Sequence, residues 1–145
     1  MARSIYPKNA QKRVTSALKK MLAPYGFENA RTDPLTMGGW QFSMETSEFV
    51  VIALQERAYA TLGIYVGSKI RRKPRAHMRG PWFLELLRGY INGDQDHYET
   101  MTPREQLDWL QANIEQLLNT PFLNSDDLNT WAVKASRRMF GQRPR

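Results

Sequence analysis

The chain has 145 residues, a net charge of +7 and no cysteine. This length predicts a single domain, residues 1–145, with an apolar core of its own. The lack of cysteine excludes disulfides, a thiol nucleophile and cysteine-based metal sites. The charge is uneven, because residues 1–79 carry 14 Lys and Arg against 5 Asp and Glu, whereas residues 80–127 carry 2 against 9. We therefore expect separate basic and acidic surfaces.

The first predicted element is a helix over Pro7–Ala23. Its lysines and arginines occupy one face, which is typical of a helix side in contact with water. The opposite face is an apolar stripe at helical spacing, made by Val14, Ala17, Leu18, Met21 and Leu22. Residues 26–39 contain two turn signals and are expected to be mostly loop, with Phe27–Thr32 as an alternative short edge strand.

Three strands are predicted between residues 40 and 66. Trp40–Glu45 alternates apolar and polar side chains, which is the pattern of a half-buried strand. Phe49–Gln55 is apolar on both faces, which predicts a central strand covered on both sides. In Tyr59–Val66 the aliphatic face should join the core, whereas the face with Tyr59 and Tyr65 is either covered by a helix or open to a partner. The strands predict an antiparallel meander of three or four strands.

Helices dominate the rest of the chain. Residues 68–80 contain a proline among packed charges, which predicts a loop. A short buried helix is expected over Trp82–Ile91. Thr102 begins the next helix with a capping box, and the apolar stripe of that helix starts at Leu107. Ser125 caps the last helix. The predicted fold class is therefore α+β, with an antiparallel sheet, an N-terminal helix and three C-terminal helices.

The basic loop is the main candidate for a binding site. Six cations in eleven residues suit phosphate groups or an acidic protein surface. The alternative is a loop in contact with water, whose charges pair with the acidic helices of the same chain. Two tyrosines of the preceding strand complete the predicted site. The predicted site residues are Lys69, Arg71, Arg72, Lys73, Arg75, Arg79, Tyr59 and Tyr65.

Two other sequence patterns are explained without a nucleic-acid or metal site. Tyrosines on an open sheet face stack bases in RNA-recognition modules, but the segment RAYATLGIY lacks their motif. Core packing is therefore the preferred interpretation. The compact set of potential metal ligands is Asp94, Asp96, His97 and Glu99. Glycine and glutamate do not fall where an EF-hand requires them, and turn and capping chemistry explains these residues, so we expect no metal site.

The sequence carries no catalytic signature. It lacks G-x-S-x-G, the P-loop, H-E-x-x-H and G-x-G-x-x-G motifs, so we expect no catalytic residues, no cofactor and no enzymatic activity. The N-terminal residues lack the apolar segment of a secretory signal, and no run approaches the ~18 apolar residues that span a bilayer. The expected location is cytoplasmic, without membrane contact, and residues 141–145 should form a frayed tail.

Three segments carry a family resemblance: LAPYGFENAR after the first helix, FVVIALQE in the middle strand and TLGIYVG in the next strand. Together they resemble a bacterial family known as domain of unknown function 4304, over residues 10–120. Thr61 stands where that family usually has asparagine. The resemblance implies an α+β fold with an antiparallel sheet and no established catalytic residues. By analogy, it also implies the neutralisation of a neighbouring toxin.

The predicted function is a non-enzymatic binding protein, of the immunity or antitoxin type, that docks a protein partner such as a toxin. Separate basic and acidic surfaces would speed the encounter with that partner. The alternative is a nucleic-acid-binding protein that uses the basic loop Lys69–Arg79. The sequence leaves open the identity of the partner and the oligomeric state.

Overall fold

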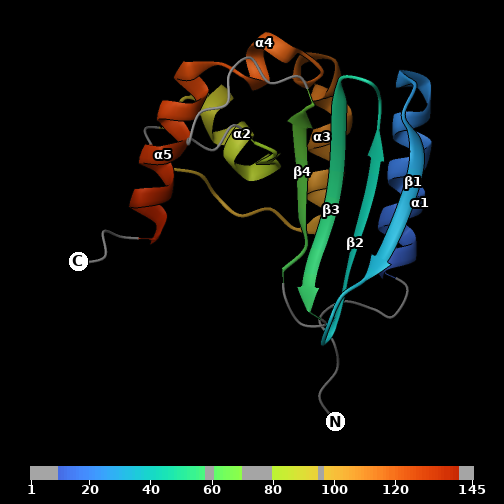
Figure 1. Cartoon of the computed structure of the whole chain (residues 1–145). Coiled ribbons are helices and arrows are strands. Elements are labelled where there is room, and N and C mark those ends of the chain that lie inside the picture. The colour runs from blue at the N-terminus through green and yellow to red at the C-terminus, as the bar shows by residue number, and fades with distance from the viewer. Residues whose placement is uncertain (1–9, 58–60, 70–79, 95–96, 141–145) are drawn as a thin grey trace.

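The computed structural model describes residues 10–57, 61–69, 80–94 and 97–140. Within them the chain forms one antiparallel sheet of five strands in the order β1-β2-β3-β4-β5 (Figure 1). The strands are β1 (Glu28–Pro34), β2 (Gly38–Glu45), β3 (Phe49–Arg57), β4 (Gly63–Ser68) and β5 (Trp82–Phe83). The helices are α1 (Ala10–Leu22), the short 3-10 helix η1 (Ala23–Tyr25), α2 (Leu84–Asn92), α3 (Pro103–Leu117), α4 (Thr120–Leu123) and α5 (Asp126–Phe140).

The predicted fold class is confirmed, because an antiparallel meander lies between an N-terminal helix and C-terminal helices. The predicted number of strands is wrong, since β1 forms where mostly loop was expected and β5 precedes α2. Strand β1 pairs with β2 in a regular register from Arg31 to Pro34, after an irregularity that follows Glu28. All of its residues except Asp33 are exposed. An edge strand without a buried face lacks the alternation by which strands are recognised.

Within the described residues, four helices follow the sheet instead of the three predicted, because the short helix α4 forms between α3 and α5. Asn119 caps α4, since its side-chain oxygen accepts a hydrogen bond from Phe122 N at 3.0 Å. Helix α2 begins at Leu84, two residues later than predicted. The reason is that Trp82 and Phe83 are extended and pair with β4.

The predicted starts of α3 and α5 are confirmed by their hydrogen bonds. Thr102 Oγ1 accepts a hydrogen bond from Glu105 N at 3.2 Å, and Glu105 Oε1 accepts one from Thr102 N at 2.9 Å, which makes a complete capping box. At α5, Ser125 Oγ accepts from Leu128 N at 3.0 Å. Such caps replace hydrogen bonds that the first turn of a helix cannot make internally, and each contributes about 1 kcal/mol.

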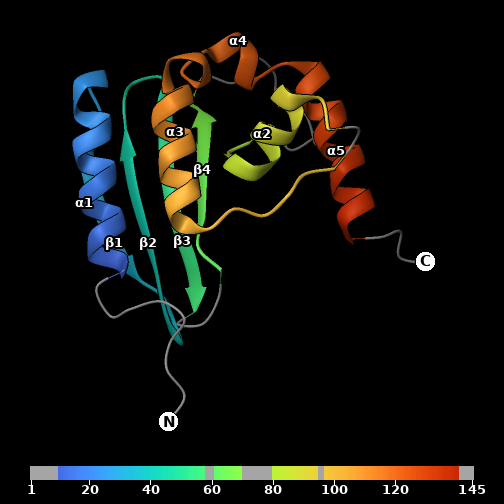
Figure 2. The same cartoon turned by 180° about the vertical axis from the view of Figure 1, so that it is seen from behind.

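Helices α1 and α3 cover one face of the sheet and run in the same direction (Figure 2). The core between these helices and the sheet includes Leu18 of α1, Phe42 of β2, Ile64 of β4 and Leu110 of α3, which are at most 1% exposed. Helices α2 and α5 pack together beyond β4. The indole of Trp82 joins β5 to α4, because its Nε1 donates a hydrogen bond to Leu123 O at 2.9 Å.

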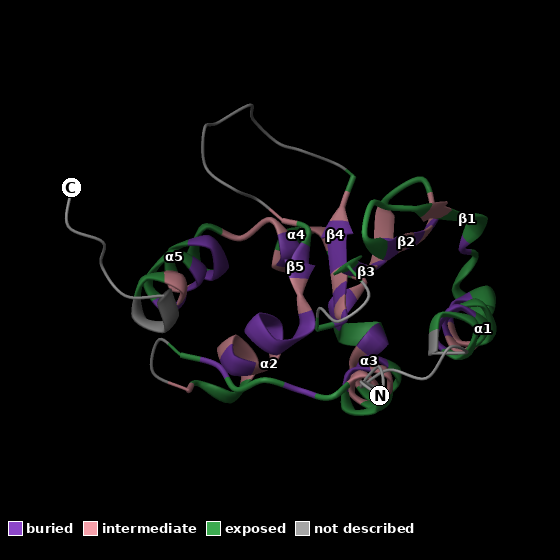
Figure 3. Ribbon diagram, turned by 90° about the horizontal axis from the view of Figure 1, so that it is seen from below, coloured by how far each residue is buried: buried purple, intermediate pink, exposed green. Residues whose placement is uncertain are grey.

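The opposite face of the sheet carries none of the described helices (Figure 3). Val50, Ile52 and Leu54 of β3 lie half-buried on this face, whereas Val51 and Ala53 on the other face are buried. The prediction that this strand is covered on both sides is therefore wrong. Strand β3 pairs with β2 and β4 along both of its edges, and its aliphatic residues on this face are half-buried although no described helix covers them.

Candidate functional site

Two of the eight predicted site residues, Tyr65 and Lys69, fall within the part of the chain that the structure describes. Tyr65 lies within β4, and Lys69 directly follows this strand. The other six lie outside the described residues, and their role in binding stays a prediction. These six are Tyr59, Arg71, Arg72, Lys73, Arg75 and Arg79.

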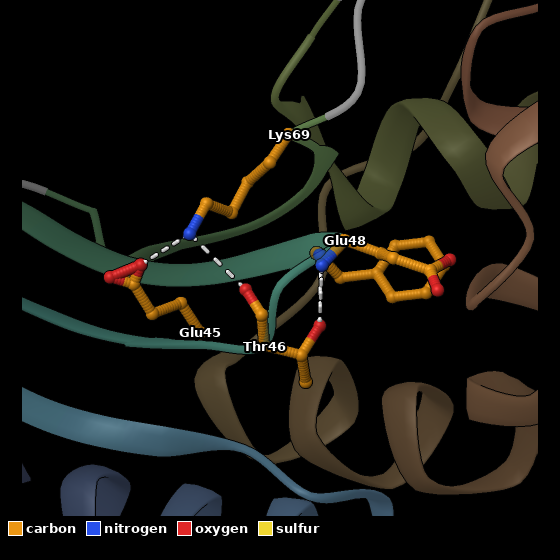
Figure 4. Close-up of polar contacts among 5 residues, drawn as sticks. Glu45, Thr46, Glu48 and Lys69 are labelled. Carbon is orange, nitrogen blue, oxygen red and sulfur yellow. Dashed lines mark hydrogen bonds and ion pairs between the residues drawn. The ribbon is translucent and has the colours of Figure 1, made fainter.

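Lys69 is held by the turn between β2 and β3 (Figure 4). Its Nζ donates hydrogen bonds to Glu45 Oε2 at 2.7 Å and to Thr46 O at 3.2 Å, and its backbone N–H donates to Glu48 O at 2.7 Å. The carboxylate partner belongs to β2 and not to the acidic helices. An exposed ion pair of this kind contributes about 0–1 kcal/mol. Lys69 therefore attaches the start of the basic loop to the sheet, and its charge is already compensated.

Tyr65 packs within a row of aromatic rings. Its ring centroid lies 6.1 Å from that of Phe83, and Phe83 lies 5.0 Å from Tyr98, both with edge-on geometry. Burial raises the pKa of the Tyr65 hydroxyl, with smaller contributions from the charges of Glu56 and Glu85. This row connects the sheet to the segment before α3, which agrees with the packing interpretation preferred for the sheet tyrosines.

The candidate metal ligands are placed by turn hydrogen bonds. His97 N donates to Asp94 O at 3.3 Å, and Asp94 N donates to Gly89 O at 3.0 Å, whereas Asp96 lies outside the described residues. Among the side chains that the structure describes, no three carboxylates or histidines converge in a metal-binding arrangement. The turn and capping interpretation accounts for these hydrogen bonds.

Glu85 of α2 is a buried carboxylate that the sequence did not single out. It is 8% exposed, and its Oε2 accepts a hydrogen bond from Met101 N at 2.5 Å. Burial raises the pKa of Glu85 above its usual value, while the Met101 hydrogen bond and the positive charge of Arg88 oppose the rise. Because the hydrogen bond joins α2 to the segment before α3, the carboxylate has a structural role.

We expect Glu85→Gln to make the protein more stable than the wild type at pH 7 but not near pH 4. Because the folded-state pKa of Glu85 is raised, its protonated carboxyl stabilises the fold at pH values below the ordinary pKa of 4.5. This stabilisation is lost as the pH rises through the folded-state pKa. Glutamine keeps an acceptor for Met101 N and never ionises. Urea unfolding at both pH values checks the prediction. Glu115→Gln, which removes an exposed carboxylate, is the control, and equal shifts for the two variants would contradict the assignment.

Residues of α1 and α3 line a groove of about 900 Å³, and Figure 2 shows that these two helices lie side by side. Its floor is apolar. The floor residues are Val14, Ala17 and Met21 of α1 and Leu107 and Ile114 of α3. Val14 and Ile114 are buried, whereas the other three are half-buried. The floor therefore combines two core residues, Val14 and Ile114, with the half-buried margins of the two apolar stripes.

The rim of the groove is mainly basic. Arg13 and Lys20 line it on α1, and Arg104 and Asp108 line it on α3. All four side chains are exposed, and none of them forms an ion pair with another described residue. Three cations against one carboxylate leave the rim with a net charge of +2. Gln111 of α3 also lines the groove and is exposed, so it offers a neutral position for substitution.

Sequence reasoning missed this groove. It placed Arg13 and Lys20 on a helix face in contact with water, which is correct for both residues, and it identified apolar stripes on both helices. It could not show that α1 and α3 lie side by side, because a helical period gives the direction of a stripe but not its neighbour. The available signal in the sequence was the apolar residues at the edge of each stripe, such as Ala17 and Leu107, which the structure shows to be half-buried.

Comparison of the chain with models of known protein families, with curated protein sequences and with solved structures found no match. The resemblance to family 4304 therefore stays a prediction. None of the described helices is long and apolar enough to cross a membrane.

Proposed function

We propose that this protein is a non-enzymatic binding protein that docks a protein partner in the groove between α1 and α3. The observation that carries the proposal is an apolar floor beneath a basic rim without ion-pair partners among the described residues. Apolar surface bounded by polar residues is a common property of protein interfaces.

The charge of the rim supports an acidic partner. Lys12 and Lys19 are exposed on α1 next to the rim residues and extend the positive field along the helix. Cations at the edge of an interface act mainly on the association rate, because they attract a partner of opposite charge before contact. Such a contribution weakens as the salt concentration rises, since the Debye length is about 8 Å at physiological ionic strength.

The lining of the groove also supports a binding role rather than a catalytic one. Asp108 is the one carboxylate among its described lining residues, and no histidine or serine accompanies it. A nucleophile is commonly activated by an adjacent general base, and Asp108 has neither a histidine nor a second carboxylate beside it among these lining residues. Within this class, we propose a toxin as the partner, as the family resemblance implies.

We expect the immobilised protein to capture a partner from a lysate of the organism that encodes it. Gln111→Trp should reduce the recovered amount at least about tenfold, equivalent to 1.4 kcal/mol of binding free energy, because the indole fills the groove. Gln116→Trp is the matched control, since Gln116 is exposed on α3 and does not line the groove. Circular dichroism verifies that both variants fold. Equal capture by the two variants would contradict the proposal.

The same protein variants distinguish protein docking from nucleic-acid binding. If the basic loop binds nucleic acid, Gln111→Trp should bind it as the wild type does, and neutralising Arg71, Arg72 and Arg75 should abolish the binding. A gel-shift series across salt concentrations measures both. Nucleic-acid binding that depends on the loop, combined with no groove-dependent protein capture, would replace the proposed function with the alternative predicted from the sequence.

A further inference from the structure

We infer that the occupant of the groove is a single acidic amphipathic α-helix presented by the partner. The inference rests on the proposed function, because it assumes that the groove is where a protein docks. It adds the secondary structure and the charge of the docked segment. Three properties of the groove carry it: the state of its backbone groups, the spacing of its floor residues and the positions of its charges.

The groove favours a helix because most of its walls offer no free backbone. Apart from Pro24 and Tyr25 of η1 and Pro103 and Arg104 in the first turn of α3, its lining residues lie within the two α-helices. Both walls are α-helices, whose N–H and C=O groups are bonded within the helix except at the ends. An extended peptide placed here would lose water from its own N–H and C=O groups without gaining partners, at about 1–3 kcal/mol for each buried group. A docked helix avoids this loss, because its backbone hydrogen bonds are internal.

The floor also has the spacing of a helix interface. Val14, Ala17 and Met21 stand at positions i, i+3 and i+7 along α1, and Leu107 and Ile114 stand at i and i+7 along α3. A helix laid in the groove presents an apolar stripe with the same repeat, so its side chains fit between those of the floor. Helix α1 has 13 residues and is therefore about 20 Å long at 1.5 Å per residue, which suits a docked helix of three to four turns, about 13 residues.

The charges of the groove rim define which charged residues the docked helix carries on either side of its apolar stripe. Arg13 and Lys20 are two helical turns apart on the same side of the groove, so they suit carboxylates that are also separated by two turns. Asp108 on the opposite wall suits one cation among those carboxylates. Arg104, beside Asp108 on α3, suits a further carboxylate. The expected segment is consequently acidic overall, with Asp or Glu on its α1 side and one Lys or Arg beside one Asp or Glu on its α3 side.

A peptide-display selection tests the inference even though the partner is unidentified. Random peptides of about 15 residues, enough to span the groove at 1.5 Å per residue, are selected on the wild-type protein and depleted on Gln111→Trp. We expect the enriched peptides to share apolar residues at i, i+3 or i+4 and i+7 and at least two Asp or Glu. A parallel selection on Arg13→Glu/Lys20→Glu should enrich Lys and Arg at the same positions.

Each outcome of the selections decides the inference. Enrichment of acidic helical patterns on the wild type, with the charge preference inverted on the double variant, supports it. Enrichment of sequences without a helical period, of basic sequences on the wild type, or of no groove-dependent sequence overturns it. The proposed function has its own test. If capture from the lysate is lost in Gln111→Trp but retained in Gln116→Trp, the proposed function stands even when the peptide selection fails. Fluorescence anisotropy of one enriched peptide should show affinity at least about tenfold lower for Gln111→Trp.

Discussion

Replacing Gln106 by leucine is expected to destabilise the protein by about 3–5 kcal/mol, a large part of the 5–15 kcal/mol that holds a typical domain folded. Gln106 of α3 is 0% exposed. Its Oε1 accepts a hydrogen bond from Ile64 N at 2.9 Å, and its Nε2 donates to Leu62 O at 2.9 Å and to Met101 O at 3.2 Å. Leucine fills a similar volume but leaves these three backbone groups without that partner, and each buried unpaired group costs about 1–3 kcal/mol.

Urea unfolding followed by the fluorescence of the four tryptophans measures this effect. Gln116→Leu is the matched control, because it makes the same chemical change at an exposed position of the same helix, where substitutions usually stay within about 0.5 kcal/mol. Gln106→Glu provides a second readout. Its carboxylate would face two carbonyl oxygens at pH 7, so it should be at least as unstable as the leucine variant and recover at acidic pH. Similar midpoints for Gln106→Leu and Gln116→Leu would contradict the bridging role.

The second large effect is expected for Gly39→Ala, which should destabilise the protein by about 3 kcal/mol or more. Gly39 lies at the start of β2 and is buried. A Cβ atom at this position would overlap the carbonyl group of Glu56 and lie 2.6 Å from Gln55 O. Both obstacles are backbone atoms of β3, so no rotamer change can relieve the clash. The two strands must separate locally, which breaks hydrogen bonds at this end of the β2–β3 pair.

Gly93→Ala distinguishes this clash from the general effect of adding a methyl group. Gly93 ends α2 with φ +69°, and a Cβ there meets no atom within 4 Å. Only the left-handed backbone opposes the substitution, at about 1–2 kcal/mol. Thermal unfolding should therefore rank the wild type above Gly93→Ala and Gly93→Ala above Gly39→Ala. The reverse order of the two variants would show that β2 can move away from β3 at little cost.

Local chemistry made the helix starts predictable. A capping box and a serine cap depend on residues three positions apart, so the patterns at Thr102 and Ser125 contain all the partners that form the structure. The meander was predictable for a related reason, since short turns between apolar segments favour neighbouring strands in antiparallel pairs. None of these features depends on contacts between distant parts of the chain.

Features that depend on distant contacts were not predictable. The apolar stripe of α3 was expected to start at Leu107, yet Leu107 is half-buried in the groove, whereas the polar Gln106 is fully buried. A glutamine becomes a core residue here because unpaired backbone groups of β4 and of the segment before α3 require a partner. The face of β3 that no described helix covers has a similar origin. Apolar content on both faces predicts burial, but the sequence does not show that neither α1 nor α3 crosses to that side.

The groove joins two parts of the chain that are far apart in sequence, since α1 supplies one wall and α3 the other. Its two walls are in register only when the sheet beneath them is formed, so the unfolded chain has no equivalent surface. Any molecule held there consequently binds the native state alone and raises its free energy of unfolding by mass action, by about 2.7 kcal/mol at a ligand concentration of 100 times Kd. Occupancy of the groove would thus protect the whole chain, including the sheet and the distant helix α5, from thermal unfolding and from proteases that cleave unfolded protein.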